Sequence, residues 1–407
     1  MKKNKESNNI VVILNAGSGI VGLALAEAAV RADFCYVVFS LSSSDFLRGM
    51  PGNLAYFDFS NSLNNLPKLK NDIIKNLSKL NSDFGFRIPI LPTDDGSLRL
   101  LNEWKDDILK YSEFSRAKNL KMGGVDKSEV IELANTLNID KLSRNNKIIY
   151  SIDDVDDVFD KFGDDAIFKP ALKPLAMDLS AMGSNGIKII RKDGNNESIR
   201  NFKNRFNLAW SLSEKWIAQP RFQIGRGLEK SVCSVRRDDS FFSCQVRELA
   251  KHPKIGGTAI WVKTTNEIDL TEETHQLLTA LDVIGVSEAS YLPDNNGNYQ
   301  LVEINTRPWL QIGLVEFSGF SIVHKTINSL MDEFIEFNKF SSLEEKYWVH
   351  LERSALAFLS RQLSFFDFFQ LINSTLHKNT IIAGYSSFFP SVKQKLIKQS
   401  IRKLLKF

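Results

Sequence analysis

The sequence predicts a mixed α/β protein with a Rossmann-like domain, an α+β domain and a mainly helical C-terminal extension. Three features indicate this order: a strand–glycine–helix–strand pattern near the start, several strands and a hairpin in the second half, and a Phe- and Leu-rich stretch after residue 330. A chain of 407 residues is long enough for two to three domains. We expect them at residues 1–120, 121–332 and 333–407, with a smaller subdomain at about 150–215.

The composition is that of an ordinary globular protein, with 43% hydrophobic and 25% charged residues. Lys and Arg number 52 against 48 Asp and Glu, and this near balance argues against a nucleic-acid partner. Three widely spaced cysteines without a metal-binding spacing indicate a reducing compartment. No apolar run approaches the roughly 20 residues of a membrane-spanning helix, so we expect a cytoplasmic protein.

The first element is a short β-branched run at residues 10–14, followed by a glycine turn. Residues 21–31 are rich in alanine and predict a helix, and residues 35–39 predict a second strand. Strand, turn, helix and strand in this order form the first βαβ unit of a parallel sheet.

The turn in this unit reads Gly17-Ser18-Gly19-Ile20-Val21-Gly22, which matches the dinucleotide-binding pattern GxGxxG. Such a site also needs an acidic residue at the end of the second strand, where the sequence instead has Ser40 and no acid before Asp45. An NAD(P)-binding oxidoreductase is therefore the less favoured alternative, and a tight βα turn without a dinucleotide is favoured.

The order of elements over residues 60–104 is not predictable. Beyond it, Asp126 is placed to cap a helix that ends at Leu137. Asn296-Gly297 predicts the turn of a hairpin between strands at 285–292 and 299–304. The remaining expected elements are strands at 166–169, 187–190, 216–219, 232–235 and 241–246, a loop at 183–186, and a helix at 271–281.

The most informative chemical motif is Glu303-Ile304-Asn305-Thr306-Arg307. Residues two apart on a strand project from the same face, so Glu303 and Asn305 would present oxygen ligands of the kind that Mg²⁺ prefers. Arg307, just beyond, would add a charge-assisted contact to a transferred phosphoryl group. A Glu-x-Asn pair alone is common on strands and mostly structural, so its meaning depends on the motifs that precede it.

Those motifs are Lys127 in Val-Asp-Lys-Ser, Lys169 in Ile-Phe-Lys-Pro, the glycine loop at residues 183–186, Trp-Ile-Ala-Gln at 216–219, and Pro-Lys-Ile-Gly-Gly at 253–257. In this order, and closed by Glu303 to Arg307, they resemble the ATP-grasp superfamily of ATP-dependent ligases over residues 115–330. The resemblance implies a pre-ATP-grasp domain, then an ATP-grasp fold of two α+β subdomains, the smaller of which is a lid.

The resemblance also implies a role for each matching residue. Lys127 and Lys169 would contact the α- and β-phosphates of ATP, and Glu229 is a candidate for the ribose hydroxyls. Arg247 would meet the γ-phosphate or an acyl phosphate, and Arg307 and Arg247 are the implied catalytic residues. The loop with Ser184, Asn185 and Gly186 would close over the phosphates, the strand of Trp216, Ile217, Ala218 and Gln219 would pair with adenine, and Glu303 and Asn305 would hold Mg²⁺ or Mn²⁺.

One position departs from the family pattern. A second acidic metal ligand is usual on the preceding strand, where this chain has Ser290. Either Glu288, two residues away on the same strand face, takes over, or Ser290 and water complete a weaker site, or the site is impaired.

The implied activity is that of a carboxylate–amine ligase, which makes an acyl phosphate from ATP and a small carboxylate and lets an amine attack it. A catalytically weak ATP-binding scaffold is the alternative that Ser290 raises. The oligomeric state stays open, with a homodimer among the options.

The C-terminal residues 391–407 contain six Lys and Arg and no acid, and their apolar positions fall near one helical face. A basic amphipathic helix of this kind either docks on its own domain, which we favour, or lies on an anionic membrane surface.

Overall fold

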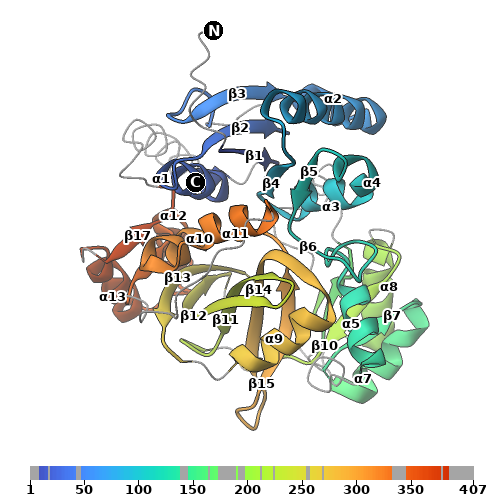
Figure 1. Cartoon of the computed structure of the whole chain (residues 1–407). Coiled ribbons are helices and arrows are strands. Elements are labelled where there is room, and N and C mark those ends of the chain that lie inside the picture. The colour runs from blue at the N-terminus through green and yellow to red at the C-terminus, as the bar shows by residue number, and fades with distance from the viewer. Residues whose placement is uncertain are drawn as a thin grey trace.

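The computed structural model describes residues 9–16, 19–42, 47–137, 145–163, 166–172, 189–190, 198–210, 213–222, 225–253, 257–267, 270–331, 345–376 and 379–384. These residues form three sheets with helices around them. Figure 1 shows the N-terminal sheet above the largest sheet, with the smallest sheet to one side and the C-terminal helices to the other.

The N-terminal domain is a five-stranded parallel sheet with the order β3-β2-β1-β4-β5. Its strands are β1 (Ile10–Asn15), β2 (Cys35–Ser40), β3 (Asn53–Asp58), β4 (Ile88–Pro92) and β5 (Ser112–Phe114). Helix α1 (Gly19–Arg31) joins β1 to β2, so the predicted βαβ unit is confirmed.

Helices cover both faces of this sheet because successive side chains of its central strands, which point to opposite faces, are apolar. Val11 and Ile13 pack in the same cluster as α1, whereas Ile10, Val12 and Leu14 pack with helices on the other face. Those helices are α2 (Leu66–Phe84), α3 (Asp95–Glu103) and α4 (Lys105–Ile108). Helices α2 and α3, with a 3₁₀ turn (Ser60–Ser62), lie in the stretch whose order was not predictable, and α4 directly follows it.

The region in which a lid subdomain is expected contains a four-stranded antiparallel sheet with the order β7-β10-β8-β9, and this sheet with its helices is called the lid below. The strands are β7 (Lys147–Ile149), β8 (Ile167–Pro170), β9 (Ile189–Ile190) and β10 (Trp216–Gln219). The helices are α7 (Val155–Phe162) and α8 (Ile199–Trp210), and a 3₁₀ turn (Ile152–Asp154) precedes α7. Its core is aromatic and includes Phe159, Phe168, Phe202, Phe206 and Trp216.

The largest sheet has eight strands, with the order β15-β14-β11-β12-β13-β16-β17 and β6 (Arg116–Ala117) paired beside β14. Its long strands are β11 (Lys230–Arg237), β12 (Ser240–His252), β13 (Thr258–Thr265), β14 (Val283–Pro293) and β15 (Tyr299–Asn305), and α9 (Thr271–Ala280) precedes β14. Strands β14 and β15 form the predicted hairpin, in which Gly297 adopts φ +84°. Only glycine takes this conformation at little cost.

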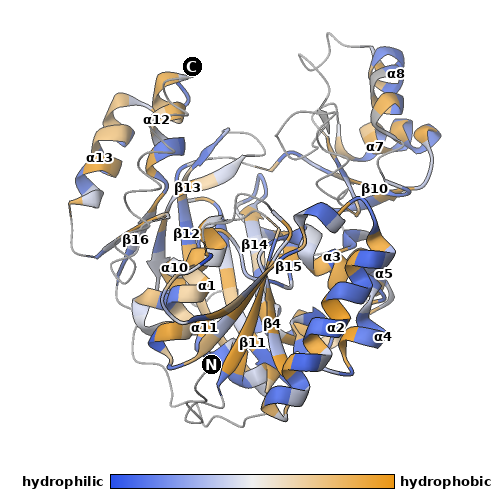
Figure 2. Cartoon of the chain, turned by 90° about the horizontal axis from the view of Figure 1, so that it is seen from above, coloured by the Kyte–Doolittle hydropathy of each residue, from blue (hydrophilic) through white to orange (hydrophobic). Residues whose placement is uncertain are grey.

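One apolar cluster joins the N-terminal domain to the largest sheet. It runs from Val11 and Ile13 through α1, α10 (Ile312–Val315) and α11 (Ile322–Leu330) to Cys233 and Val262 of the largest sheet. A π-helical segment, Glu316–Phe320, connects α10 to α11. Figure 2 shows the apolar strands in the centre and polar outer faces on α2, α4 and α5 (Lys127–Thr136).

The residues after 345 are helical in α12 (Leu351–Leu359) and α13 (Phe365–Thr375), as predicted. Two short strands were not predicted: β16 (Tyr347–Val349) pairs with β13, and β17 (Thr380–Ile382) pairs with β16, so both continue the largest sheet. Phe365, Phe366 and Phe369 of α13 are 62–75% exposed. The predicted basic helix at 391–407 lies outside the described residues, so its docking and its membrane contact stay predictions. Within the described part of the chain, no helix is long and apolar enough to cross a bilayer.

Replacing Phe206 by Ala should unfold the lid while leaving the N-terminal sheet intact. Phe206 is fully buried and its ring contacts those of Phe168 and Trp216 at 5.1 and 4.8 Å between centroids. Truncating a buried Phe costs about 3–5 kcal/mol. Hydrogen exchange should show loss of amide protection in β8 and β10 but not in β1 and β2.

The matched control is Phe365→Ala, because this phenylalanine is 75% exposed. It should leave the protection of the lid strands unchanged. Equal loss of protection in β1 and β10 of the Phe206 variant would show that the lid does not unfold separately.

Candidate active site

The candidate site is built around β15, the edge strand of the largest sheet. Carbonyl oxygens on the outer side of an edge strand have no strand partner. Lys127 Nζ donates to the carbonyl of Ile304 and lies 3.5 Å from Asn305 Oδ1. Lys169 Nζ donates to the carbonyl of Val302 at 3.1 Å. The two lysines, which are 42 positions apart, therefore meet at one strand.

Local structure explains how Lys127 reaches β15. Asp126 caps α5 (Lys127–Thr136) by accepting from the Ser128 amide at 2.9 Å, which confirms the predicted helix start. The preceding Gly124 has φ +96°, and a Cβ there would lie 3.0 Å from the Thr306 side chain. Glycine at this position thus lets the turn before α5 approach the end of β15 closely.

Lys169 and Gln219 come from adjacent strands of the lid, β8 and β10. Gln219 Nε2 donates to the same Val302 carbonyl at 3.0 Å and to Asn146 Oδ1 at 2.6 Å. Strand β10 lies between β7 and β8, and residues Trp216, Ile217 and Ala218 pair with both neighbours. Their backbone groups are used within the sheet, so the structure does not offer them to adenine as the resemblance implied. Only Gln219, at the end of the strand, points to β15.

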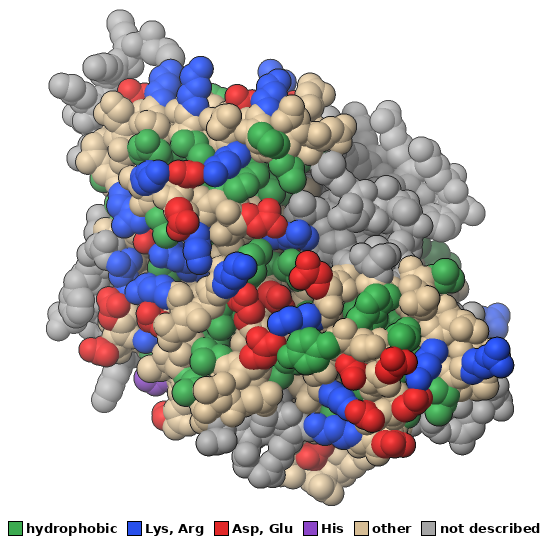
Figure 3. Space-filling model, turned by 90° about the vertical axis from the view of Figure 1, so that its right-hand side faces the viewer, with side chains coloured by type: hydrophobic (Ala, Val, Ile, Leu, Met, Phe, Trp, Pro, Cys, Tyr) green, Lys and Arg blue, Asp and Glu red, His purple; other side chains and the backbone are tan. Residues whose placement is uncertain are grey.

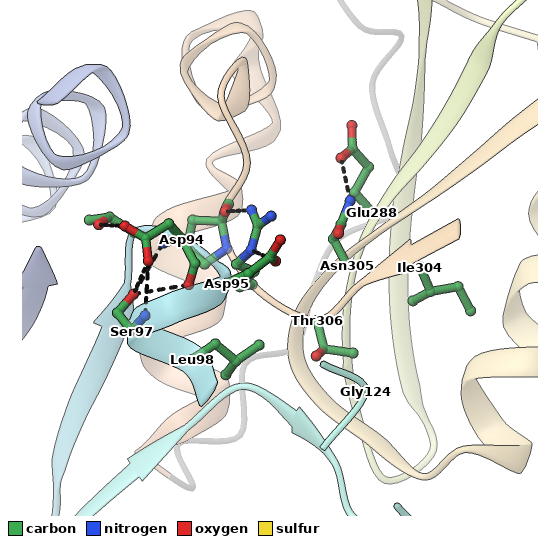
Figure 4. Close-up of polar contacts among 12 residues, drawn as sticks. Asp94, Asp95, Ser97, Leu98, Gly124, Glu288, Ile304, Asn305 and Thr306 are labelled. Atoms are coloured by element: carbon green, nitrogen blue, oxygen red, sulfur yellow. Dashed lines mark hydrogen bonds and ion pairs between the residues drawn. The ribbon is translucent and has the colours of Figure 1, made fainter. Parts of the chain in front are cut away.

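The acidic part of the site follows from the register of β14 and β15. Glu288 lies opposite Asn305, and Ser290 lies opposite Glu303. Asn305 Nδ2 donates to Glu288 Oε2 at 3.3 Å, as Figure 4 shows. Ser290 Oγ is 3.1 Å from Ser231 Oγ, on the neighbouring strand β11. Glu288 is thus the acidic side chain of β14 beside Asn305, and Ser290 occupies the position across from Glu303.

Burial raises the pKa of Glu288 to about 8, and the negative charge of Glu303 adds to this shift. The positive charge of Arg307 and the hydrogen bond from Asn305 act in the opposite direction and do not cancel it. A carboxyl group in this state binds a proton at neutral pH, and a cation placed between the two acids would displace that proton.

Glu229 belongs to a second acidic group on the same part of the molecule. Lys251 Nζ donates to Glu229 and lies 3.2 Å from Glu248 Oε1. Burial raises the pKa of Glu248 to about 8, helped by the charge of Glu229. The carboxylates of Glu248 and Glu229 in turn raise the pKa of Lys251, although burial alone would lower it. Glu229 also contributes to the raised pKa of Glu288, which places both acidic groups in one electrostatic environment.

Arg307 connects the site to the N-terminal domain. Its Nε donates to Asp95 Oδ1 at 2.5 Å, and Asp95 is the first residue of α3. Figure 4 shows Asp94 and Asp95 beside the residues that follow β15. Burial would lower the pKa of Arg307, but the charges of Asp95, Asp94 and Glu288 raise it above its usual value. A buried guanidinium held this way keeps its charge close to Glu288.

Arg247 is an implied site residue that the structure does not bring to β15. Arg247 is paired in register with Lys230 and Lys263, one residue before Glu248, and neighbouring residues of a strand project to opposite faces. Its guanidinium and the ammonium of Lys230 both donate to Glu267. Arg247 therefore lies on the face away from the acids. The loop of Ser184, Asn185 and Gly186 lies outside the described residues.

The glycine turn after β1 has a packing role at its last position. A Cβ on Gly22 would lie 3.0 Å from Leu47 and 3.6 Å from the Asn15 side chain, so a small residue lets α1 lie close to β1. At the end of β2, Ser40 Oγ donates to the Ser42 carbonyl, and this serine stands where a dinucleotide site has its acid. These contacts favour the tight βα turn over an NAD(P) site.

The donors at β14 and β15 fit one divalent cation that is completed by other ligands. Mg²⁺ is commonly held by one or two carboxylates together with phosphate oxygens and water. Glu303, Asn305 and Glu288 supply two carboxylates and an amide oxygen on paired positions of two strands. Within the described residues no group of three or more His, Cys, Asp or Glu is arranged to hold a metal alone.

Sequence analysis missed three residues that the structure adds to the site: Asp95, Glu248 and Lys251. Asp94 to Ser97 form a capping box, a pattern that predicts a helix start but not its partner Arg307. Lys251 lies two residues before the Pro-x-x-Gly-Gly segment, and this closeness to a site motif was the one weak indication in the sequence that it belongs to the site. Glu248 carried none, because its role depends on strand register.

Solved structures with this fold come from several ligases and carboxylases. An N5-carboxyaminoimidazole synthetase from Staphylococcus aureus shares 15% identity, has a TM-score of 0.60, and aligns over 87% of this chain and 86% of its own. A biotin carboxylase from Campylobacter jejuni shares 15% identity, has a TM-score of 0.59, and aligns over 84% of this chain and 75% of its own. An L-amino acid ligase from Bacillus licheniformis shares 12% identity, has a TM-score of 0.55, and aligns over 81% of this chain and 77% of its own.

No protein-family model matches the sequence, and no curated protein matches it either. The structural likeness nevertheless extends over most of each chain. These neighbours are ATP-grasp enzymes, so the chain has the ATP-grasp fold, as the sequence motifs implied.

Replacing Glu288 by Gln should stabilise the protein more at pH 8 than at pH 5. The folded protein holds the Glu288 proton up to about pH 8, whereas the unfolded chain loses it near the ordinary value of 4.5. Between these pH values the wild type loses free energy of unfolding as pH rises, by about 1.4 kcal/mol per pH unit, and the variant does not. Urea unfolding at a series of pH values measures the difference.

Glu272→Gln, which removes an exposed carboxylate on α9, is the matched control. A stability difference between wild type and the Glu288 variant that stays constant from pH 5 to pH 8 would contradict the assigned environment of Glu288.

Proposed function

We propose that this protein is an ATP-dependent ligase that activates a small carboxylate as an acyl phosphate and joins it to an amine, releasing ADP and phosphate. The observation that carries this proposal is the meeting of Lys127, Lys169 and Asn305 at β15. Cations from two separate elements beside an amide and two carboxylates are what a magnesium-bound triphosphate needs.

The partners of the two lysines support a phosphate-binding role. Their ammonium groups donate to carbonyl oxygens of β15, which carry no net charge. Hydrogen bonds from an ammonium to a phosphate oxygen are charge-assisted and stronger than those to a carbonyl. ATP would therefore draw Lys127 and Lys169 from Ile304 and Val302, and β15 holds both side chains near the required place beforehand.

The neighbouring structures support the same reaction class. The S. aureus synthetase was solved in complex with ADP, and the C. jejuni biotin carboxylase with β-γ-ATP. The L-amino acid ligase of B. licheniformis is named for joining amino acids. At 11–16% identity these enzymes do not identify the acid or the amine of this protein.

In the proposed reaction the carboxylate oxygen attacks the γ-phosphorus, ADP leaves, and the amine then displaces phosphate from the acyl carbon. Glu303, Asn305 and Glu288 would hold Mg²⁺, which neutralises charge on the phosphates. Lys127 and Lys169 bind the same phosphates. Arg307, kept charged by Asp95, is placed to bind the carboxylate or the phosphoryl group that reacts with it.

The face shown in Figure 3 fits small-molecule substrates better than a nucleic acid. Lys and Arg side chains are interspersed there with Asp and Glu, and no continuous basic surface is seen. The formal net charge of +4 agrees with this distribution. Binding of a polyanion depends on an extended set of cations that contact phosphates.

Ser290 favours a second candidate function, an ATP-binding scaffold with little turnover. It lies opposite Glu303 and hydrogen-bonds with Ser231, where a second carboxylate would hold another cation. Loss of one metal ligand weakens charge neutralisation in the transition state more than binding of the nucleotide.

Lys127→Met and Lys169→Met should each weaken binding of a magnesium complex of a non-hydrolysable ATP analogue by roughly tenfold to a hundredfold, the value of one or two charge-assisted contacts. Calorimetric titration of the full chain measures this, and NADH titrated in parallel should give no saturable heat. Lys68→Met, at an exposed lysine of α2, should bind the analogue like wild type. Unchanged affinity in both site variants would refute the phosphate-binding role.

A screen of small acids and amines should show ADP release that requires one acid and one amine together, if the protein is a ligase. Ser290→Glu should raise the affinity for Mg²⁺, because it restores a carboxylate opposite Glu303. Higher Mg²⁺ affinity without ADP release with any pair would favour the scaffold over the ligase.

A further inference from the structure

A cavity of about 340 Å³ lies between the largest sheet and the C-terminal helix α13, apart from the candidate active site. Leu249, Trp261, Lys263 and Tyr347 line it from strands β12, β13 and β16, and Arg226 lines it from the turn before β11. Gln370, Asn373 and Ser374 of α13 complete the lining. We propose that this cavity binds a small aromatic anion.

The cavity is on the opposite face of the sheet from the acidic groups. Lys263 pairs in register with Arg247, whereas Glu248 pairs with the adjacent Val262. Because neighbouring strand residues face opposite ways, Lys263 and Glu248 project to different sides of the sheet. A ligand here would thus bind apart from the ATP proposed above, and the inference does not rest on that function.

The charge of the lining indicates an anion. Arg226 and Lys263 both line the cavity, and no Asp or Glu is among the described residues that line it. Arg226 is held by Asp367 of α13 at 3.0 Å, which fixes the guanidinium at the rim and ties the helix to the turn. The charge of Arg226 is thus paired with that of Asp367, whereas Lys263 forms no ion pair with a carboxylate among the described residues, and its ammonium favours a negatively charged occupant.

The remaining lining indicates an aromatic body for this anion. Trp261 and Tyr347 form one wall, with ring centroids 6.4 Å apart and planes 31° from each other. The Arg226 guanidinium lies 4.8 Å from the centre of the Trp261 ring. Trp261 is almost fully covered, so Tyr347, which is partly exposed, is the ring on which a flat ligand can stack while its charged group meets Lys263.

One buried polar atom also points to a missing acceptor. Trp261 is only 3% exposed, and its Nε1 has no hydrogen-bond partner among the described residues. A buried indole N–H without an acceptor costs free energy, and a ligand oxygen that reached this N–H from the cavity would remove that cost. The volume is at the lower end of small-molecule sites, so the occupant is closer in size to a ring with one acidic group than to a nucleotide.

The test is calorimetric titration of the full chain with phenyl phosphate and with benzoate, which carry the ring with a phosphate or a carboxylate. The matched controls are phenol, which has the ring without the anionic group, and inorganic phosphate, which has the anionic group without the ring. We expect saturable binding of at least one aromatic anion and binding of the controls that is weaker by roughly tenfold or more. The stronger of the two anions identifies the acidic group.

Lys263→Met should weaken this binding by roughly tenfold or more, the value of one charge-assisted contact, whereas Lys263→Arg should retain it. Trp261→Phe keeps a ring but removes the N–H, and should also weaken binding. Lys169→Met serves as the control for the candidate active site, because a probe bound at the phosphate position there would lose affinity in this variant. Thermal unfolding of each variant checks that it is folded.

Absence of saturable heat for both anions at millimolar concentration would overturn the proposal, and so would equal binding of phenol or inorganic phosphate. Loss of binding in the Lys169 variant with full binding in the Lys263 variant would place the probe at β15, which also overturns it. None of these results bears on the ligase activity, which the ATP and ADP experiments decide.

Discussion

The open edge of β15 is the constraint on which the site depends. This strand ends the largest sheet, so the outward carbonyls of Val302 and Ile304 have no strand partner. Buried or partly buried carbonyls need donors. They receive them from Lys127 on α5 and from Lys169 and Gln219 on the lid, so three parts of the chain are held at one strand. The same contacts keep two ammonium groups beside Asn305.

Positive and negative side chains lie on opposite sides of β15. The lysines approach β15 from its open edge, whereas Glu288 lies across the β14–β15 pairing. Burial is the main cause of the raised pKa of Glu288 and of Glu248, and the charges of neighbouring acids add to it. Arg307 offsets part of this repulsion, and Asp95 keeps it in place from another domain. Such an arrangement is costly by itself and would become favourable with the cation and phosphates of the proposed function bound.

The C-terminal extension adds to the largest sheet instead of forming a separate unit. Strands β16 and β17 lengthen the sheet beyond β13, and α13 then covers the face away from the acids. The two faces of one sheet therefore carry different side chains: the carboxylates of Glu288 and Glu248 on one face, and cations beside aromatic rings on the other. Alternation along the strands produces this division without any additional element.

Local patterns in the sequence determined most of the elements around the site. The Asp126 cap, the Asn296-Gly297 turn and the strand of Glu303 and Asn305 all depend on residues close together in the chain, and the structure has them as predicted. Tertiary structure alone decided which side chains meet. Strand register turned Arg247 away from the acids and brought Glu248 to them, and packing between domains gave Arg307 its partner Asp95. One residue of register reverses the face of a side chain, and no short-range pattern records it.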